Sequence, residues 1–406
     1  MAAGALELPS IKPGSSAKVP LPSASHRFQC EAGAEVYLSV FFTLKTETRW
    51  AGVGHEVAWF QHRLQAAKTP SPAKAPSAAA RQLDLKTTPS TITVTGDSFS
   101  FTFDQALGHL THWTANNTAL LSPDPTTSAA ITPSFWRPPT DNDMSASLPY
   151  WQRFGVDALT TQLRATTLTP PTPTNPSATI TFTTLHTPPV LDWGILATTT
   201  YTIHPSPQTQ PGGVLTIHVH LTPSGAHPPL HIPRAGLDLH LPPALAAARW
   251  AGLGPGESYP DKRGAQRMGV WGPAGVRELQ GAEYEVPQEG GNRMGTRWVT
   301  VAGDGNGAGV RAVKEDGGVW KVGEGGGGEE EGDRGGFSFR VGRVADRVVQ
   351  AAKHPCDLVE VEATLLRLDG RVAGVGTAAC GPGVREDLLV PVEEMEFGFR
   401  LEAVGV

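Results

Sequence analysis

Residues 91–104 read TITVTGDSFSFTFD, and their pattern indicates an all-β fold. On both sides of Gly96–Asp97, apolar and polar residues alternate with a period of two, as they do in a strand with one buried face. A glycine-acid step between two such runs is typical of a tight hairpin turn. The stretch therefore predicts two antiparallel strands joined at Gly96.

The same alternation continues through the rest of the chain. It returns in stretches that turn-forming residues separate: ATITFTTLH (178–186), TTTYTIH (198–204), LTIHVHLT (215–222), VEVEATLLRLDG (359–370) and EEMEFGFRLEAV (393–404). The 46 glycines and 36 prolines favour many turns and short strands over long helices. The sequence therefore predicts an all-β protein with sandwich-like layers.

Composition divides the chain into three parts. Residues 1–66 include VYLSVFFTLKT (36–46), whose β-branched and aromatic residues predict a strand of a small β domain. Residues 67–90 are rich in Ala, Pro, Ser and Lys, which predicts a linker. The remaining residues, 91–406, are predicted to form one large β domain.

Two segments of the large domain depart from the strand pattern. RVADRVVQAAKH (343–354) has apolar residues at helical spacing and few helix breakers, so a helix is expected there. Residues 322–336, VGEGGGGEEEGDRGG, contain almost nothing that a core could bury. We expect a disordered surface loop over this range.

Charge, hydropathy and cysteine usage exclude several classes of protein. The net charge of −6 provides no positive field that would attract a nucleic acid. No run of apolar residues approaches the length that a membrane-spanning helix needs. Three widely spaced cysteines predict reduced thiols and a cytoplasmic location, with no disulfide framework or zinc site. The N-terminus lacks the basic and apolar regions of a signal peptide.

FWRPPTDND (135–143) is the stretch with the densest polar chemistry. Asp141 and Asp143 could form a carboxylate pair of the kind that retaining glycosidases use, or could hold a cation. The alternatives are a structural turn, in which Asp and Asn side chains bind nearby backbone groups, and a rigid loop that faces a polar ligand. The stiff Pro138–Pro139 step suits positioning better than proton transfer.

Two further motifs contain residue types that occur in metal sites or dinucleotide-binding sites. His55, Glu56 and His62 could suggest a metal site, but their spacing is not that of two ligands on one helical face, which favours structural histidines. GLGPGESYPDKR (252–263) is glycine-rich, but its prolines oppose the helix that a dinucleotide fingerprint requires. A shaped loop is expected there, with Tyr259, Asp261 and Arg263 in a local polar network. Tryptophans such as Trp250 are assigned to the core.

Motifs in this order resemble the C-terminal part of glycoside hydrolase family 2 β-galactosidases, from about residue 8 to the C-terminus. WAGVGHEVAWFQHRL (50–64) is similar to the last strands of the immunoglobulin-like domain of that family. The motifs that carry the rest of the resemblance are FWRPPTDND, IPRAGLDLHL (232–241), WAGLGPGESYPDKR (250–263), PQEGGNRMGTRW (287–298), AAKHPCDL (351–358) and GVGTAACGPG (374–383). The resemblance implies the end of an immunoglobulin-like sandwich over 1–66, then a large antiparallel supersandwich with a galactose-mutarotase-like fold.

The resemblance also implies which residues lie near substrate. In the family, the DND and CGP loops come near the mouth of the active site, so Trp136, Arg137, Asp141, Asn142 and Asp143 are expected to face a sugar pocket. The late glycine loop contains Cys380, Gly381 and Pro382 and is expected to lie next to the substrate as well. Some members of the family carry a tryptophan on this loop; it is absent here, so the stacking role of that tryptophan does not transfer to this chain.

The catalytic part of the family is expected to lie elsewhere. Its two catalytic glutamates belong to a TIM barrel, which typically uses Mg and Na ions, and no asparagine here is followed by a glutamate. We therefore expect a chain without catalytic residues, cofactors or metal ligands of its own, whose partners are a catalytic part or further copies of itself, and a β-galactoside. Whether it is an enzyme by itself stays open. The alternatives are a stand-alone carbohydrate-binding module and a purely structural assembly subunit.

Overall fold

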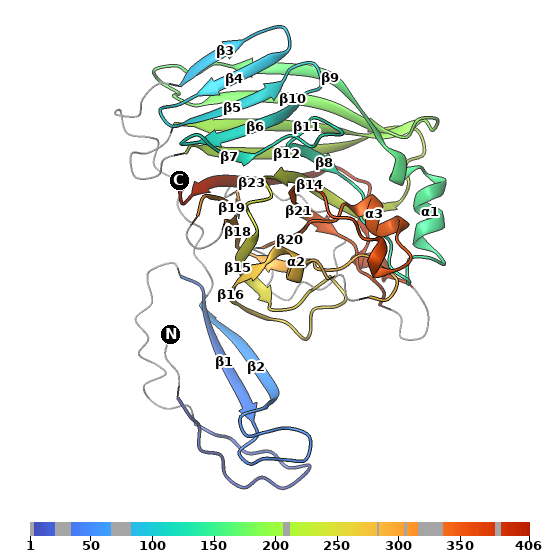
Figure 1. The fold of residues 1–406 in the computed structure, drawn as a ribbon. Coiled ribbons are helices and arrows are strands. Elements are labelled where there is room, and N and C mark those ends of the chain that lie inside the picture. The colour runs from blue at the N-terminus through green and yellow to red at the C-terminus, as the bar shows by residue number, and fades with distance from the viewer. Residues whose placement is uncertain are drawn as a thin grey trace. The chain divides into compact units, whose positions relative to one another are not determined.

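The computed structural model describes residues 4–20, 34–65, 83–205, 212–281, 284–303, 307–315, 336–377 and 383–406. The chain forms two compact units, Met1–Pro70 and Ser71–Val406. The ribbon in Figure 1 shows strands throughout both units and only short helices. The prediction of an all-β protein is confirmed.

The first unit is described as one antiparallel hairpin. Strand β1 (Val36–Thr43) pairs with β2 (Glu56–Gln65), so that Val40 lies opposite Phe60. The strand predicted over 36–46 is confirmed in its first eight residues. This hairpin lies within the range 1–66 predicted to be the end of an immunoglobulin-like domain, of which residues 4–20 and 34–65 are described.

Three sheets build the second unit. The nine-stranded sheet has the order β16 (Arg267–Gly275), β15 (Ala247–Gly254), β18 (Trp298–Ala302), β19 (Gly309–Lys314), β23 (Met395–Val404), β12 (Val214–Gly225), β11 (Trp193–His204), β10 (Ala178–Thr187) and β9 (Thr160–Thr169). One five-stranded sheet contains β3 (Asp84–Thr87), β4 (Thr91–Thr95), β5 (Phe99–Asp104), β6 (His109–Ala115) and β7 (Thr118–Leu121). The other contains β17 (Arg293–Thr296), β20 (Phe337–Gly342), β21 (Thr364–Val372), β14 (Arg234–Leu241) and β8 (Ile131–Ser134).

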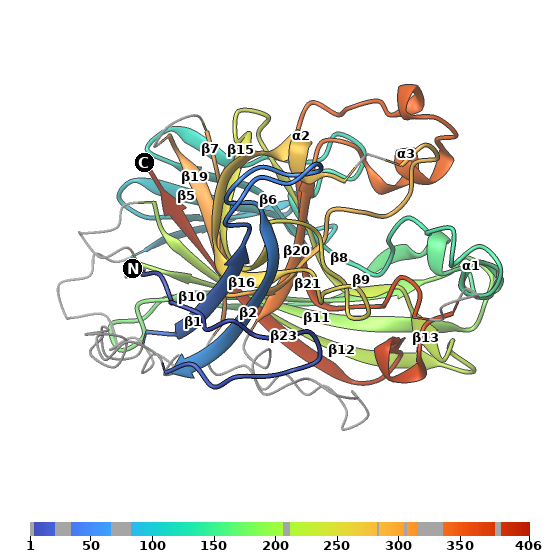
Figure 2. The same ribbon diagram turned by 90° about the horizontal axis from the view of Figure 1, so that it is seen from below.

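Short elements complete the unit. Strands β13 (His231–Ile232) and β22 (Val390–Pro391) form a small pair, and the helices are α1 (Ser147–Arg153), α2 (Val276–Leu279) and α3 (Asp346–Ala351), with 3-10 turns at Val156–Ala158, Pro355–Asp357 and Glu386–Leu388. Figures 1 and 2 both draw α1 and α3 at the same side of this unit. The helix expected over 343–354 is confirmed as α3, although it is shorter than the pattern suggested.

The hairpin predicted at 91–104 is present as β4 and β5. Val94 lies opposite Phe101, and the Gly96 amide donates to the Phe99 carbonyl at 2.9 Å across the turn. Ile92, Val94, Phe101 and their neighbours on the same face are buried, because the period-two pattern turns every second side chain inward.

Both five-stranded sheets pack on one face of the nine-stranded sheet. Phe103 of β5 contacts the ring of Tyr201 on β11 at 5.3 Å between centroids. Trp250 of β15 meets Phe339 of β20 at 5.7 Å. The register from β11 through β12, β23, β19 and β18 to β15 places Tyr201 and Trp250 on the same face. The predicted supersandwich is therefore confirmed.

Two predicted boundaries differ from the structure or fall outside it. Residues 84–87, inside the range 67–90 assigned to a linker, form β3 and pair with β4, because Leu85 packs against the core. The linker prediction is wrong for this end of the range. The predicted disordered loop, 322–336, lies outside the described residues except for Gly336.

Within the described ranges, none of the helices has the length and apolarity that crossing a membrane requires.

Candidate functional site

The FWRPPTDND segment begins where β8 ends and runs to α1. Strand β8 pairs with β14, and this pairing fixes the start of the segment. Further along, Trp136 donates from Nε1 to Gln350 Oε1 of α3 at 3.1 Å. Arg137 through Thr140 are buried, whereas Asp141 and Asn142 are exposed. The segment therefore passes through the interior and surfaces only at its tip.

Arg137 and Asp143 close the segment on itself. The Arg137 guanidinium donates from Nη1 to Asp143 Oδ2 at 2.7 Å and from Nη2 to Oδ1 at 3.3 Å. The same carboxylate accepts the Thr140 amide at 2.7 Å and the Thr140 hydroxyl at 2.9 Å. Burial lowers the pKa of Arg137, but Asp143, Glu289 and Tyr259 together outweigh burial, and the net effect raises that pKa. Asp143 thus stabilises the turn.

Asp141 and Asn142 bridge to two other loops. The Asp141 amide donates to Gln288 Oε1 at 2.9 Å, and Gln288 Nε2 donates back to the Asp141 carboxylate at 3.4 Å. Asn142 Nδ2 donates to the Val375 carbonyl at 2.8 Å. Asp141 and Asp143 therefore face different partners, and they do not form the facing carboxylate pair that was considered from the sequence.

Asp261 holds the beginning of the late glycine loop. Its carboxylate accepts the amides of Val375 and Gly376, each at 2.9 Å, and the hydroxyl of Thr377 at 3.0 Å. Arg137 reaches the same segment from the other side, where Nη2 donates to the Gly374 carbonyl at 3.2 Å. The FWRPPTDND segment, the loop around Asp261 and the GVGT segment (374–377) are thus tied together, and we call them the loop cluster.

Gly376 allows the closest approach within the loop cluster. Its φ of +134° lies in a region that side chains rarely adopt, and an added Cβ would come within 2.2 Å of Asn142 Nδ2. Cys380, Gly381 and Pro382 lie outside the described residues. The residues that flank them are joined, because the Thr377 amide donates to the Gly383 carbonyl at 2.6 Å.

Glu289 is the central acceptor beneath the loop cluster. Arg367 donates two hydrogen bonds to it, at 2.6 and 3.0 Å, and the Tyr259 hydroxyl donates one at 3.1 Å. Burial raises the pKa of Glu289, but the charges of Arg367 and Arg340 outweigh burial and bring that pKa to about 2. Burial beside the Glu289 carboxylate raises the pKa of Tyr259 well above its ordinary value. Glu289 is therefore a structural carboxylate that stays ionised.

A third buried ion pair lies on the neighbouring strands β14 and β21. Arg234 donates from Nε to Asp369 at 2.6 Å, from Nη1 to Asp238 at 2.8 Å and to the Trp136 carbonyl at 3.3 Å. Burial raises the pKa of Asp369, although Arg234 opposes that shift. This pair links the core sheet to the FWRPPTDND segment.

The motifs locate these loops in the sequence, but several of the residues that hold the loops together are not among the predicted site residues. Gln288, Glu289, Arg367 and Asp369 were not singled out as partners. The signal was present for Arg367 and Asp369, since they occupy alternate positions of a largely buried, leucine-rich strand. A local polar network of Tyr259, Asp261 and Arg263 was expected, but the Tyr259 hydroxyl bonds to Glu289 and the Asp261 carboxylate accepts from Val375, so both side chains reach other loops. Trp250 is buried in the core, as expected. His55 packs edge-on against Trp50, at 5.2 Å between centroids.

The arrangement of these side chains suits the positioning of a ligand better than the cleavage of a bond. The buried carboxylates of Asp143, Glu289 and Asp369 each face an arginine. The exposed groups at the tip are Asp141 and Asn142, which the surrounding hydrogen bonds hold in place. A rigid polar rim of this kind can contact a ligand without supplying the acid and base for hydrolysis.

The fold and the loop cluster define a large antiparallel β-sandwich protein with a rigid polar rim. Residues 95–401 match the family described as "Beta galactosidase small chain", and residues 1–65 match "Beta-galactosidase, domain 4". The chain belongs to the β-galactosidase small-chain family.

Relatives with this similarity are longer proteins. The β-galactosidase of Kluyveromyces lactis is 25% identical over 98% of this chain and 34% of its own length. That of Arthrobacter sp. is 27% identical over 97% of this chain and 35% of its own length. The chain thus spans about a third of these relatives.

Among solved structures, a galactose mutarotase related enzyme from Lactobacillus acidophilus covers 77% of this chain and 97% of its own. It is 8% identical and has a TM-score of 0.40, which is too low to carry a functional argument.

Proposed function

We propose that this chain is the C-terminal, non-catalytic portion of a β-galactosidase that hydrolyses terminal β-D-galactose residues. Its loop cluster contributes to the mouth of an active site whose catalytic glutamates belong to a separate barrel part. The observation that carries the proposal is the match of residues 95–401 to the β-galactosidase small-chain family.

The loop cluster supports this role through its shape. Asp141 and Asn142 lie at an exposed tip, while the groups behind them are buried and paired. Exposed polar groups on a preorganised loop bind a polyhydroxylated ligand at a low entropic cost. Trp136, Arg137 and Asp143 would then act by supporting the tip, and Cys380, Gly381 and Pro382 would lie on the neighbouring loop.

The proposal assigns partners and location as well. The partner is the catalytic part of a β-galactosidase, or further copies of this chain, and the ligand is a β-galactoside. Any Mg or Na ion that hydrolysis requires would belong to the catalytic part. The three widely spaced cysteines favour the reducing cytoplasm.

Complementation tests the proposal. The purified chain is mixed with the portion of the Kluyveromyces lactis β-galactosidase that this chain does not match, and hydrolysis of a chromogenic β-galactoside is measured. We expect no turnover by the chain alone and restored turnover in the mixture. Asp141→Ala should lower the restored kcat/KM while the complex still forms, because its carboxylate is exposed. Asp192→Ala is the matched control, since Asp192 is an exposed aspartate between β10 and β11.

The outcomes separate the alternatives. Turnover by the chain alone would contradict a non-catalytic role. Saturable binding of a galactoside by the chain alone, without any restoration, would favour a stand-alone carbohydrate-binding module. Restoration that neither Asp141→Ala nor Asn142→Ala affects would favour a purely structural assembly subunit.

A further inference from the structure

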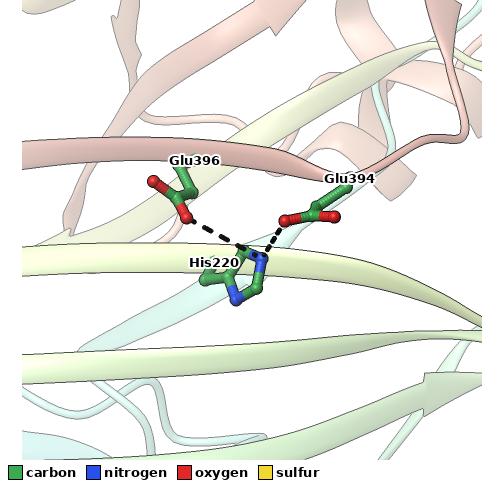
Figure 3. Close-up of side chains that lie close together, drawn as sticks. All are labelled: His220, Glu394 and Glu396. Carbon is green, nitrogen blue, oxygen red and sulfur yellow. Dashed lines mark hydrogen bonds and ion pairs between the residues drawn. The ribbon is translucent and has the colours of Figure 1, made fainter. Parts of the chain in front are cut away.

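His220, Glu394 and Glu396 meet on the outer face of the nine-stranded sheet. His220 on β12 lies directly opposite Glu396 on β23, and Glu394 immediately precedes Met395, the first residue of β23. Val219 and Leu221 of β12 point into the core, so His220 points away from it. Figure 3 shows both carboxylates turned toward the same ring nitrogen of His220.

The three side chains present one nitrogen and two oxygens to a common point. His220 Nε2 lies 3.1 Å from Glu394 Oε1 and 3.9 Å from Glu396 Oε1. The three ligand atoms all lie within 4.8 Å of one another. A tetrahedral ion with ligand bonds near 2.1 Å needs its ligands about 3.4 Å apart, so small rotations of the glutamates suffice.

Within the described ranges, His220 is the ion-pair partner that the structure gives to Glu394 and Glu396. One ring N–H can donate to only one carboxylate, and the distance of 3.9 Å to Glu396 is too long for a hydrogen bond. Among the described residues, no lysine or arginine forms an ion pair with Glu394 or Glu396. The arginines of the same strand region face other carboxylates: Arg371 pairs with Glu393 at 3.5 Å, and Arg400 pairs with Glu402 at 2.6 Å. Two like charges this close favour a cation between them.

We propose that His220, Glu394 and Glu396 bind a divalent transition-metal ion of the zinc class. Imidazole nitrogen and carboxylate oxygen are both zinc ligands, whereas an imidazole ligand disfavours magnesium and calcium. Three protein ligands leave one position for water. The site lies at the surface, with 34% of the His220 side chain, 58% of the Glu394 side chain and 22% of the Glu396 side chain accessible, so the ion can exchange with solvent.

The position of the site gives the ion a structural role. It would join β12 to the beginning of β23 through His220 and Glu394, which are 174 positions apart in the chain. An ion that binds the folded chain and not the unfolded chain stabilises the fold by mass action. This inference does not depend on the proposed function, because its readouts do not involve galactoside hydrolysis.

The test uses the full chain after removal of metal with a chelator. Zinc binding is measured by calorimetry at neutral pH, and thermal unfolding is followed with and without zinc. We expect one zinc ion per chain at this site and a higher Tm with zinc than without. His220→Gln and Glu396→Gln should each weaken binding at this site by at least about tenfold and abolish the zinc-dependent rise in Tm.

Matched controls are His112→Gln and Glu362→Gln, which replace an exposed histidine and an exposed glutamate elsewhere. Both should keep the zinc affinity and the rise in Tm. Circular dichroism of every variant without metal shows whether the fold is intact. The proposal is overturned if zinc binds the two site variants as tightly as the original chain, if no zinc binds at millimolar concentration, or if magnesium binds this site in preference to zinc.

Discussion

The guanidinium of Arg137 and the carboxylate of Asp143 form a two-point ion pair, at 2.7 and 3.3 Å, in which both side chains are buried. The pair spans Pro138–Pro139 and the Thr140 amide, so it sets the shape of the FWRPPTDND segment from inside. Of the interpretations considered from the sequence, the structural turn describes Asp143. Only Asp141 and Asn142 remain at the surface.

Loss of the Arg137 side chain should destabilise the second unit strongly. Arg137→Ala leaves the Asp143 carboxylate buried without its cation, which typically costs about 3–5 kcal/mol. Urea unfolding of the full chain measures this loss. Arg277→Ala removes an arginine from an exposed pair with Glu360 and should change the free energy of unfolding very little. Equal effects of the two substitutions would contradict the buried role of Arg137.

A side chain at residue 376 should disturb the contact between two loops. Gly376→Ala places a Cβ against Asn142 and requires an unfavourable φ, at a cost of about 1–3 kcal/mol. We expect faster hydrogen exchange at the Val375 and Gly376 amides and a lower Tm. Gly383→Ala is the matched control, because an added Cβ there meets nothing within 4 Å. A normal exchange rate in Gly376→Ala would show that the loop has room to adjust.

Glu289 should contribute to loss of stability in acid. Its pKa falls from 4.5 to about 2 on folding, so its stabilising effect is complete above pH 4.5 and is lost as pH falls toward 2. The size of this contribution is on the order of 3 kcal/mol. Glu289→Gln should therefore be less stable at neutral pH and show a shallower loss of stability between pH 4.5 and 2. Glu362→Gln should keep the original pH slope. The prediction fails if the slopes of Glu289→Gln and the original chain coincide.

The hairpin of the first unit should promote self-association. Phe60 is 57% exposed and Trp50 is 68% exposed, and Phe41 and Phe42 are exposed on the partner strand. Exposed apolar side chains on a two-stranded edge favour contact with another chain. Light scattering should show concentration-dependent association that Phe60→Thr reduces. Leu230→Thr, which removes an exposed leucine from the second unit, should not reduce it. A monodisperse monomer at all concentrations would contradict this prediction.

Local pattern accounted for the strands and the general architecture. The alternation at 91–104 predicted β4 and β5 because a strand with one buried face needs a period of two. Helical spacing at 343–354 located α3, but the length was wrong, since Ala352 is extended and ends the helix. The short strand β3 was missed, because its four residues DLKT carry too little pattern to distinguish them from the preceding linker composition.

The all-β class, the hairpin at Gly96 and the motifs through which the chain belongs to its family can be read from the amino-acid sequence. That Asp143 points inward to Arg137 while Asp141 is exposed is visible only in the folded chain, because side-chain direction in a loop depends on what packs against it. Contacts between residues that are far apart in the sequence likewise depend on what packs together. Asp261 reaches Val375, and His220 reaches Glu394, because strand order and loop packing bring them together. Strand order depends on which faces can be buried against each other, and that is a property of the whole chain, which no local stretch encodes.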